Sequence, residues 1–543
     1  MEPRQRSELT LRPYQKEALS AVLAARRSGV RRMLVCLPTG SGKTVIFSEL
    51  AKLAQRQVLV LAHREELLEQ AREKLERALD GAGIVAIERG EQRAGKNAKV
   101  LVCSIRSLHE ARLAQVLEGR DFGLVIYDEC HHAAAADNRR VLQQLGAFDS
   151  QWTGTLLGFT ATTSRGDGQG LDEIFERIVY SRSLPEMIED GFLTPLRGYR
   201  ISTSADLRRL SGSGLDFGED ELAEAVDIEE RNALVARSIQ ELARDRRTIV
   251  FCVTVQHAMH LAQAMNAVGV RTGIVHGAMP RDLRKETLAQ FRSGFFQAIT
   301  NVGVLTEGFD DPEVSCVAMA RPTRSAGLYA QCVGRGTRPY PGKANCLILD
   351  FVDLSTLSLC TLPSLFGTPY ELDLRGGDAN EARKVWLQIQ MDHPGFELEA
   401  GALTLSEIKA RAASFDPLTL AVNDEVLAIS GNAWFSLGRY GVGLHFERQP
   451  GRASEALVLK RGHRGKAWEV TLDGRVMSRF SRLEEAVEAV DYELGRMGRH
   501  ALVSARPGAA WRSGKADDVL VLRAWQRING GAPVKGPRAG AGT

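Results

Sequence analysis

Cysteine is scarce in this sequence, and other features that would place it outside ordinary globular proteins are missing as well. The eight cysteines among 543 residues form no C-x-x-C pair, so we expect buried, reduced thiols, no disulfide framework and no zinc. No apolar run approaches the ~18 residues of a membrane span, and residues 1–15 contain no apolar leader. These absences predict a cytoplasmic protein without a membrane partner.

A strong excess of one charge is also lacking, although the charge is distributed unevenly. Lys and Arg total 70 against 67 Asp and Glu, which argues against a uniformly basic nucleic-acid coat and against a disordered polyelectrolyte. Residues 1–400 carry a net −3, whereas residues 401–543 carry +6. Since a domain usually holds about 100–200 residues, three or four domains are expected.

Short apolar runs alternate with helical patterns in two successive series. Runs of strand length without polar interruption are typical of buried parallel strands. The first series lies at residues 31–38, 57–62, 98–104, 122–129 and 154–162, and the second at 247–254, 271–277, 297–302, 314–320 and 344–351. The pattern predicts the α/β class, with two tandem doubly wound parallel-sheet domains at residues 1–200 and 236–355.

The remaining segments are predicted from composition and turn signals. Polar stretches indicate a connector at residues 201–235 and a linker at 356–400. Residues 401–530 indicate a smaller α+β domain with antiparallel strands, a hairpin turn at Asp473-Gly474, and a helix with Ser481 as its N-cap and Glu484 completing a capping box. Residues 531–543 are expected to be disordered.

The strongest chemical signal is PTGSGKT at residues 38–44, between an apolar strand and a helical pattern. Glycines there let backbone amides close around phosphate oxygens at a helix N-terminus. Lys43 is expected to bridge the β and γ phosphates, and Thr44 to offer its hydroxyl to magnesium. The residues predicted to cradle the phosphates are Thr39, Gly40, Ser41, Gly42, Lys43 and Thr44.

Two adjacent carboxylates, Asp128 and Glu129, end the apolar strand LVIY. Open α/β sheets bind ligands at the carboxyl ends of their strands, so Asp128 is predicted to hold magnesium and Glu129 to orient and deprotonate the attacking water. His131 and His132 follow, but the sequence shows no partner cluster that would make them zinc ligands.

A pair of arginines lies in the second α/β domain, within QCVGRGTR at residues 331–338. Arg335 and Arg338 are three residues apart and can share one helical face, which allows both to point at one anion. Arginine is well suited to stabilising charge on a phosphoryl group in transfer. Taken alone, the same segment could be a solvated basic turn.

These motifs, taken in order, resemble those of the superfamily 2 helicases and DNA translocases, whose paired RecA-like domains close on ATP. The segments that carry the resemblance are LRPYQKEA (11–18), PTGSGKT (38–44), DECH (128–131), GFTAT (158–162), TNVGVLTEGFDDP (300–312) and QCVGRGTR (331–338). Four phrases narrow the branch: LRPYQ, DECH, YSRSLPEMIEDGFLTPLRG (180–198) and VGRGTRPYPGKANCLILDF (333–351). They are most similar to the branch of the type III restriction motor subunit and the XPB-like repair helicases, and within it to RadD-like DNA repair helicases.

The resemblance implies roles that spacing alone does not assign. Gln15 would recognise the adenine base, with Arg12 as a helper. The residues implied to couple hydrolysis to domain movement are His131, Thr160 and Thr162. Those implied to meet the nucleotide from the second domain are Gly308, Asp310 and the catalytic set Gln331, Arg335 and Arg338. RadD-like proteins often carry a cysteine-rich zinc element, which this sequence lacks.

Nucleic acid would be gripped by small polar residues and backbone amides, since a translocase must hold any sequence. The residues that match such segments are His63, Arg64, Ser104, Thr254, His276 and Thr300. Taken individually, these residues could equally be caps and turn residues.

The resemblance implies an ATP- and magnesium-dependent DNA helicase or translocase that acts on branched or damaged DNA in repair. We expect a monomer located near the nucleoid, with duplex, forked or branched DNA as partner and single-stranded-DNA-binding or repair proteins as candidate partners. An RNA helicase, a motor subunit of a restriction or defence complex, and an ATP-switched DNA-binding module without unwinding activity remain alternatives.

The basic C-terminal region is interpreted from its residues alone. Five of the six tryptophans lie from Trp386 onward, interleaved with Arg and Lys. Such aromatics can stack on unpaired bases, while basic side chains contact phosphates. The candidate phosphate contacts are Arg439, Lys460, Arg461, Arg464, Lys466, Arg475, Arg479 and Arg482. The alternative is an ordinary α+β domain with tryptophan in its core.

Overall fold

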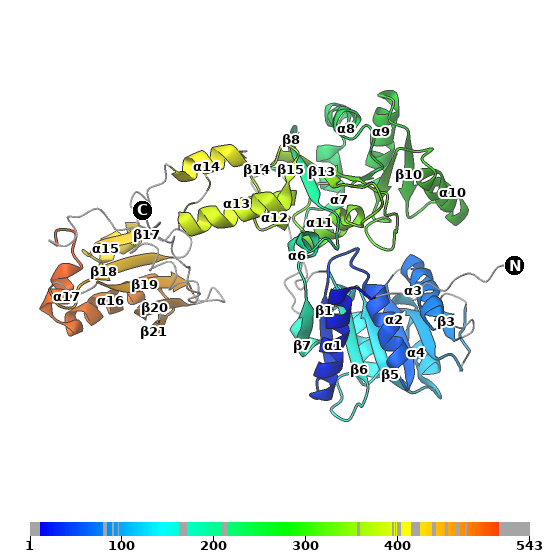
Figure 1. Ribbon diagram of the computed structural model, residues 1–543, viewed down its shortest axis with the longest axis horizontal. Coiled ribbons are helices and arrows are strands. Elements are labelled where there is room, and N and C mark those ends of the chain that lie inside the picture. The colour runs from blue at the N-terminus through cyan, green and yellow to red at the C-terminus, as the bar shows by residue number, and fades with distance from the viewer. Residues whose placement is uncertain are drawn as a thin grey trace, which may run out of the picture. The chain divides into compact units, whose positions relative to one another are not determined.

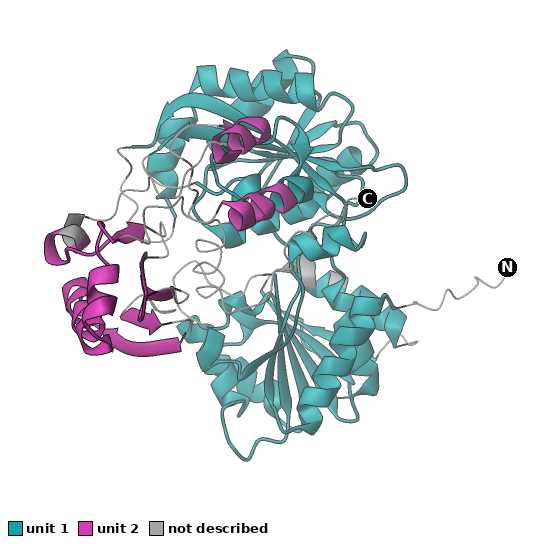
Figure 2. Cartoon of the chain, turned by 60° about the vertical axis from the view of Figure 1, so that its left-hand side comes forward, with its two compact units in different colours: residues 1–383 teal, residues 384–543 magenta. Residues whose placement is uncertain are grey.

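The computed structural model divides the chain into two compact units, Met1–Arg383 and Lys384–Thr543 (Figures 1 and 2). The residues that it describes are 11–63, 65–79, 84–89, 92–95, 97–161, 171–208, 210, 216–355, 359–393, 396, 398, 403–413, 424–436, 441–450, 454–461, 467–472 and 475–509. Unit 1 contains two α/β lobes, each built on its own sheet of seven strands.

The first lobe has a parallel sheet in the order β3-β4-β2-β5-β6-β1-β7. Its central strands are almost wholly buried because they are apolar along their full length and helices lie beside them (Figure 1). The elements are α1 (Pro13–Arg27), β1 (Arg32–Cys36), α2 (Lys43–Leu53), β2 (Gln57–Ala62), α3 (Glu65–Ala78), β3 (Val85–Glu88), β4 (Val100–Ser104), α4 (Glu110–Leu117), β5 (Phe122–Asp128), α5 (Ala136–Gln144), β6 (Thr155–Thr160), β7 (Arg177–Ser181) and α6 (Leu184–Glu189).

The second lobe has a sheet in the order β10-β11-β9-β12-β13-β8-β15, parallel except for the short β15. Its elements are β8 (Leu196–Asp206), α7 (Glu219–Val226), α8 (Glu229–Leu242), β9 (Thr248–Phe251), α9 (Val255–Ala267), β10 (Thr272–His276), α10 (Arg281–Arg292), β11 (Ala298–Val302), β12 (Cys316–Met319), α11 (Ala326–Val333), β13 (Cys346–Leu354), α12 (Leu362–Leu365), β14 (Leu372–Asp373), β15 (Gly377–Asp378) and α13 (Ala379–Asp392), which extends past the unit boundary. Both predicted parallel-sheet domains are therefore confirmed.

The predicted boundaries of the first domain and the connector are wrong. Residues 196–206 form β8, which pairs with β13 in the second sheet, and α7 and α8 pack on the same lobe rather than forming a connector. Polar residues interrupt β8, so it lacks the continuous apolar run that identifies a central parallel strand.

Much of the predicted linker 356–400 also belongs to the second lobe. Leu362 and Phe366 are buried in its core, and the backbone amide of Leu362 donates to Asp350 Oδ2 at 2.7 Å. β15 then adds an antiparallel strand to β8. The segment is mostly polar and contributes only a few buried apolar side chains to the core. Its composition therefore does not distinguish it from a linker.

Unit 2 is the smaller domain, with an antiparallel five-stranded sheet in the order β17-β18-β19-β20-β21 packed against helices. Its elements are β16 (Leu403–Thr404), α14 (Leu405–Ala413), α15 (Asp424–Ile429), β17 (Trp434–Ser436), β18 (Val442–Phe446), β19 (Glu455–Arg461), β20 (Trp468–Leu472), β21 (Arg475–Phe480), α16 (Leu483–Met497) and α17 (Arg499–Ser504). The predicted α+β domain is confirmed, but the N-cap of α16 is Arg482 and Ser481 instead donates to Glu485. The Asp473-Gly474 turn and residues 531–543 lie outside the described residues.

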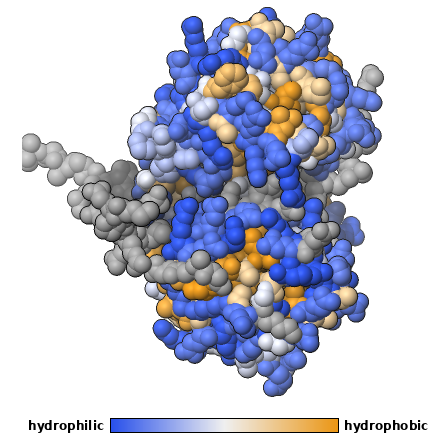
Figure 3. Space-filling model, turned by 90° about the vertical axis from the view of Figure 1, so that its right-hand side faces the viewer, coloured by the Kyte–Doolittle hydropathy of each residue, from blue (hydrophilic) through white to orange (hydrophobic). Residues whose placement is uncertain are grey.

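In the part of the chain that the structure describes, no helix has the length and apolar character needed to cross a membrane. The face in Figure 3 is largely hydrophilic, with separate apolar patches between the polar side chains. All eight cysteines are free thiols, and seven of them are buried.

Candidate active site between two lobes

The loop between β1 and α2 has the conformation that the PTGSGKT motif predicts. Gly40 and Gly42 have positive φ angles of 86° and 77°, so the turn uses the left-handed region that glycine enters without a Cβ clash. Gly42 is the N-cap of α2, and Lys43 is its first residue. The loop is held from α1, where the Tyr14 hydroxyl donates to the carbonyl of Ser41.

Lys43 and the two carboxylates of the DECH motif form a buried charged cluster. Lys43 Nζ donates to Glu129 Oε1 at 2.9 Å, and neither side chain is more than 10% exposed. Burial alone would raise the pKa of Glu129, but the adjacent Lys43 ammonium outweighs it and the pKa is lowered. Burial and the adjacent Glu129 raise the pKa of Asp128 to about 6. The cluster therefore holds more potential negative charge than one ammonium can balance.

The residues around this cluster fit a magnesium-bound phosphate. The hydroxyl oxygens of Thr39 and Ser41 are buried and have no hydrogen-bond partner, which is costly unless a ligand supplies one. Two carboxylates beside a loop of backbone amides offer oxygen ligands for a hard cation and donors for an anion. The loop, Asp128 and Glu129 can thus hold both parts of a metal–nucleotide complex.

The arginine pair lies in the second lobe, where α11 passes into the 3₁₀ turn Gly334–Gly336. Arg335 donates to the carbonyl of Phe309 at 2.7 Å, and Arg338 donates to the same carbonyl at 3.2 Å. Arg338 also pairs with Asp310 Oδ1 at 2.8 Å. Burial, with a further effect of Arg338, lowers the pKa of Arg335 to about 10, so it remains a cation at neutral pH.

The turn that carries these arginines contacts the phosphate-binding loop directly. Thr337 Oγ1 donates to the carbonyl of Thr39 at 3.2 Å. A Cβ placed on Gly334 would lie 2.5 Å from Thr39 Cβ, and one on Gly40 would lie 3.0 Å from Thr337 Oγ1. The arginine pair of one lobe and the Lys43 loop of the other therefore face one site.

A chain of polar contacts connects the lobes beside this loop. Gln331 Nε2 lies 3.3 Å from His131 Nε2, and His131 Nδ1 lies 3.5 Å from Glu129 Oε2. An amide nitrogen only donates, so the imidazole Nε2 accepts and its proton is on Nδ1. Burial lowers the pKa of His131 to about 4, which keeps the ring neutral. The neutral His131 ring therefore lies between Gln331 of the second lobe and Glu129 of the first.

Comparison with known proteins agrees with this geometry. Residues 8–165 match the family model described as type III restriction enzyme, res subunit, and residues 230–339 match the helicase conserved C-terminal domain. A Schizosaccharomyces pombe protein, provisionally named as the mitochondrial ATP-dependent helicase irc3, is 35% identical over 443 residues, which cover 80% of this chain and 72% of that protein. The chain belongs to the superfamily 2 helicases.

Two further relatives support the restriction-motor and XPB branch of this family. The Saccharomyces cerevisiae protein provisionally named ATP-dependent helicase IRC3 is 30% identical, with 66% of this chain and 53% of that protein covered. The DNA 3'-5' translocase XPB2 of Sulfurisphaera tokodaii is 25% identical, with 65% of this chain and 83% of that protein covered. The chain is therefore a nucleic-acid-dependent ATPase of the helicase type.

The residues predicted to recognise the base lie at the start of α1. The backbone amide of Arg12 donates to Gln15 Oε1 at 2.9 Å, and the Arg12 guanidinium donates to the carbonyl of Phe192 at 3.2 Å. Gln15 Nε2 lies 2.9 Å from where a Cβ on Gly42 would be, so this side chain borders the phosphate loop. The sequence assigned no role to Phe192, although it lies in the 180–198 segment that carries the family resemblance; its ring centroid lies 4.7 Å from that of Tyr14, a contact that residue spacing does not reveal.

Glu307 and Thr194 also contact the site, although their positions in the sequence assign them no role. Glu307, buried in the second lobe, places Oε1 3.6 Å from His132 Nε2, so the histidine pair does have a carboxylate neighbour. Thr194, in the segment between the lobes, donates from its hydroxyl to the carbonyl of Arg338 at 3.0 Å. Gly308, which the family resemblance implied would meet the nucleotide, has a φ of 72°, which allows the bend before Asp310.

The residues predicted to contact nucleic acid differ in their exposure and in their hydrogen-bond partners. His63 stacks on His132 with ring centroids 4.5 Å apart, while Ser104 is buried at the end of β4. Thr254 caps α9 by accepting from the amide of His257 at 3.2 Å, and His276 is half-buried at the end of β10. Arg64 lies outside the described residues.

The burial of Thr300 contradicts its predicted contact with a nucleic-acid phosphate. Thr300 is 0% exposed and donates from its hydroxyl to the carbonyl of Ala258 at 3.0 Å, so it does not face solvent as a phosphate contact must. Its strand, β11, has neighbours on both sides, and its side chain lies under α9. Thr160, predicted to couple hydrolysis to movement, is also fully buried at the end of β6, and Thr162 lies outside the described residues.

Proposed function

We propose that this protein is an ATP- and magnesium-dependent DNA helicase or translocase that acts on branched or damaged DNA in repair. The observation that carries the proposal is the direct contact between the Arg335–Arg338 turn and the Lys43 loop, beside the buried pair Asp128 and Glu129. Such an arrangement can turn phosphate hydrolysis in one lobe into movement of the other.

Hydrolysis would begin with an exchange of partners at Lys43. Its ammonium now pairs with Glu129 and would instead bind phosphate oxygens, which frees Glu129 to orient and deprotonate a water. Thr44 and Asp128 would hold magnesium, which when bound neutralises phosphate charge. Arg335 and Arg338 would stabilise charge on the γ-phosphoryl oxygens from the second lobe. The contact between Gln331 and His131 would couple the nucleotide-bound state of the first lobe to the position of the second.

DNA as the track is supported by two relatives, the DNA 3'-5' translocase XPB2 of Sulfurisphaera tokodaii and the type I restriction enzyme EcoAI endonuclease subunit of Escherichia coli. The first lobe's match to the restriction family also favours one alternative, a motor within a restriction or defence complex. Copurification with a nuclease subunit would support that alternative. A monomer close to the nucleoid, with single-stranded-DNA-binding or repair proteins as partners, remains part of the proposal.

Unit 2 would supply contacts to branched DNA through basic side chains rather than through its core tryptophan. Trp434 is buried in the core, as the α+β alternative predicts, and Trp468 packs partly against it. Arg475 is exposed on β21, and Arg479 on the same strand pairs with Glu469 at 2.8 Å. Trp511, Trp525, Arg439, Arg464 and Lys466 lie outside the described residues.

The experiment that tests the choice of track is strand displacement with forked DNA, blunt duplex DNA and an RNA duplex of matched sequence. We expect ATP-dependent unwinding of the fork, less of the blunt duplex, and none of the RNA. The variant Arg475→Glu should weaken fork binding and reduce the dependence of affinity on salt by about one phosphate contact, with Glu447→Gln in the same unit as control. Unwinding of RNA but not DNA would contradict the proposal.

A further inference from the structure

A tight turn follows the arginine pair and returns the chain toward it. Pro341 and Gly342 occupy the central positions of a turn closed by the amide of Lys343, which donates to the carbonyl of Tyr340 at 3.0 Å. Gly342 has a φ of 82°, and proline followed by glycine is the sequence that a type II turn prefers. The turn therefore directs the Lys343 side chain back to the loop it has just left.

The Lys343 ammonium donates to three backbone carbonyls. They belong to Gly336 at 2.7 Å, Arg338 at 2.9 Å and Pro312 at 3.1 Å. An ammonium has three N–H donors, so the group is fully used. Two of these carbonyls lie in the turn that carries the arginines, and the third ends the loop that contains Phe309 and Asp310.

The two loops are therefore joined at two points. On one side Arg335 and Arg338 donate to the carbonyl of Phe309, and on the other Lys343 connects Pro312 to Gly336. A Cβ on Gly336 would lie 2.2 Å from Cys346 Sγ, so the turn also packs closely on β13. With both points fixed, the arginine side chains have little freedom to tilt away from the phosphate loop.

We propose that Lys343 is a positioning residue, which holds the arginine turn in the orientation that lets Arg335 and Arg338 reach the γ-phosphate. The inference rests on the proposed role of that arginine pair. All three hydrogen bonds of the Lys343 ammonium go to carbonyls of the second lobe, so its effect should fall on turnover rather than on nucleotide binding.

The pKa of Lys343 depends on its burial and on the charges around it, and it sets the pH at which the ammonium loses a proton. Burial lowers the pKa of Lys343 to about 8, and the nearby guanidinium groups of Arg338 and Arg246 lower it further, while the Asp311 carboxylate raises it. Burial raises the pKa of the Cys346 thiol to about 11, so this thiol stays neutral near pH 8, and the Asp311 carboxylate is paired with Arg247 at 3.2 Å.

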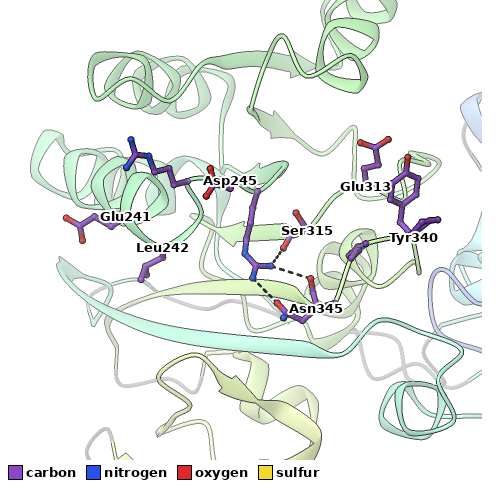
Figure 4. Close-up of a pocket in the computed structure, with 13 residues that line it drawn as sticks. Glu241, Leu242, Asp245, Glu313, Ser315, Tyr340 and Asn345 are labelled. Atoms are coloured by element: carbon purple, nitrogen blue, oxygen red, sulfur yellow. Dashed lines mark hydrogen bonds between the residues drawn. The ribbon is translucent and has the colours of Figure 1, made fainter.

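Lys343 is half-buried and lines a cavity of about 600 Å³, whose other lining residues include Tyr340 and Asn345. Figure 4 shows Tyr340 and Asn345 in this cavity. Arg246, in the same cavity, is held by the carbonyls of Ser315 and Asn345. Above pH 8 the neutral amine of Lys343 would have only two N–H donors for its three carbonyl partners, so one of the three hydrogen bonds would be lost. Turnover should therefore fall with loss of one proton near pH 8.

The test compares Lys343→Met and Lys343→Arg in the full chain, with the exposed Lys52→Met as matched control. We expect Lys343→Met to lower kcat for DNA-stimulated ATP hydrolysis by roughly 10-fold or more, because small misplacements of catalytic groups cost that much. The KM for ATP should change little. Lys343→Arg should recover part of kcat and lose the decline near pH 8, since guanidinium keeps its charge.

Folding and the arginine role are checked separately. Thermal unfolding and nucleotide affinity should match wild type for Lys343→Arg, so a fall in kcat there cannot be attributed to misfolding. If Arg335→Ala leaves kcat unchanged, the proposed role of the arginine pair is wrong. If Arg335→Ala lowers kcat while both Lys343 variants keep the wild-type kcat and pH profile, the positioning inference is wrong.

Discussion

Gly334 offers the sharpest test of the contact between the lobes, because its substitution adds one methyl group at one place. Its backbone is helical, with φ −59° and ψ −16°, so alanine suits the conformation and should not weaken the second lobe. The added Cβ would lie 2.5 Å from Thr39 Cβ, where ordinary contacts begin at 3.4 Å. The lobes would have to separate by about 0.9 Å at this point.

A misplacement of that size costs up to about 10²-fold in rate when it separates catalytic groups. We therefore expect Gly334→Ala to lower the kcat of DNA-stimulated ATP hydrolysis by roughly 10- to 100-fold, with unchanged thermal unfolding. Gly95→Ala, where nothing lies within 4 Å of the added Cβ, is the matched control. The double variant Gly334→Ala, Thr39→Gly should recover part of the rate. A kcat for Gly334→Ala within twofold of wild type would refute the close contact.

Two predictions concern the second lobe. The Asp353 carboxylate accepts two hydrogen bonds, at 2.7 and 3.0 Å, from the buried Arg231 guanidinium. Asp353→Ala should therefore lower the free energy of urea unfolding by about 3–5 kcal/mol, because it leaves a buried charge without a partner. The double variant Arg231→Met, Asp353→Leu should recover most of this loss, and an equal loss in both variants would contradict the account. Burial lowers the pKa of His257 from 6.5 to about 4, so stability present above pH 6.5 should fall by up to about 3 kcal/mol as pH approaches 4. His257→Gln should flatten that slope and exposed His260→Gln should not; an unchanged slope in His257→Gln would count against the burial argument.

The sequence predicted the strands that lie in the middle of each sheet, because continuous apolar runs have no other place to be buried. Leu59 and Val102 illustrate this, each fully buried in a central strand. β8 escaped prediction because arginine and serine interrupt it, and β15 because it is only two residues long. Their positions depend on β13, which lies far away in the chain, so local pattern could not reveal them.

The sequence predicted the contacts between residues of the motifs, but it did not predict the surrounding residues that hold these motif residues in place. Lys43 follows β1 and Glu129 follows β5, and parallel strands end at the same edge of a sheet, so the two motifs could be expected to meet there. Phe192, Glu307 and Lys343 act through contacts set by tertiary structure, and no spacing reports them. The motif likeness assigned Thr300 to nucleic acid, but a central strand under α9 buries it instead.

ATP hydrolysis measured with and without DNA tests the central claim most directly. Wild-type protein should hydrolyse ATP slowly alone and faster with single-stranded or forked DNA, while an RNA of the same sequence should have little effect. Glu129→Gln keeps the size of the side chain beside Lys43 but removes the base, so it should bind ATP and DNA without turnover. Substantial DNA-stimulated hydrolysis by Glu129→Gln, or stimulation of wild type by RNA alone, would contradict the account.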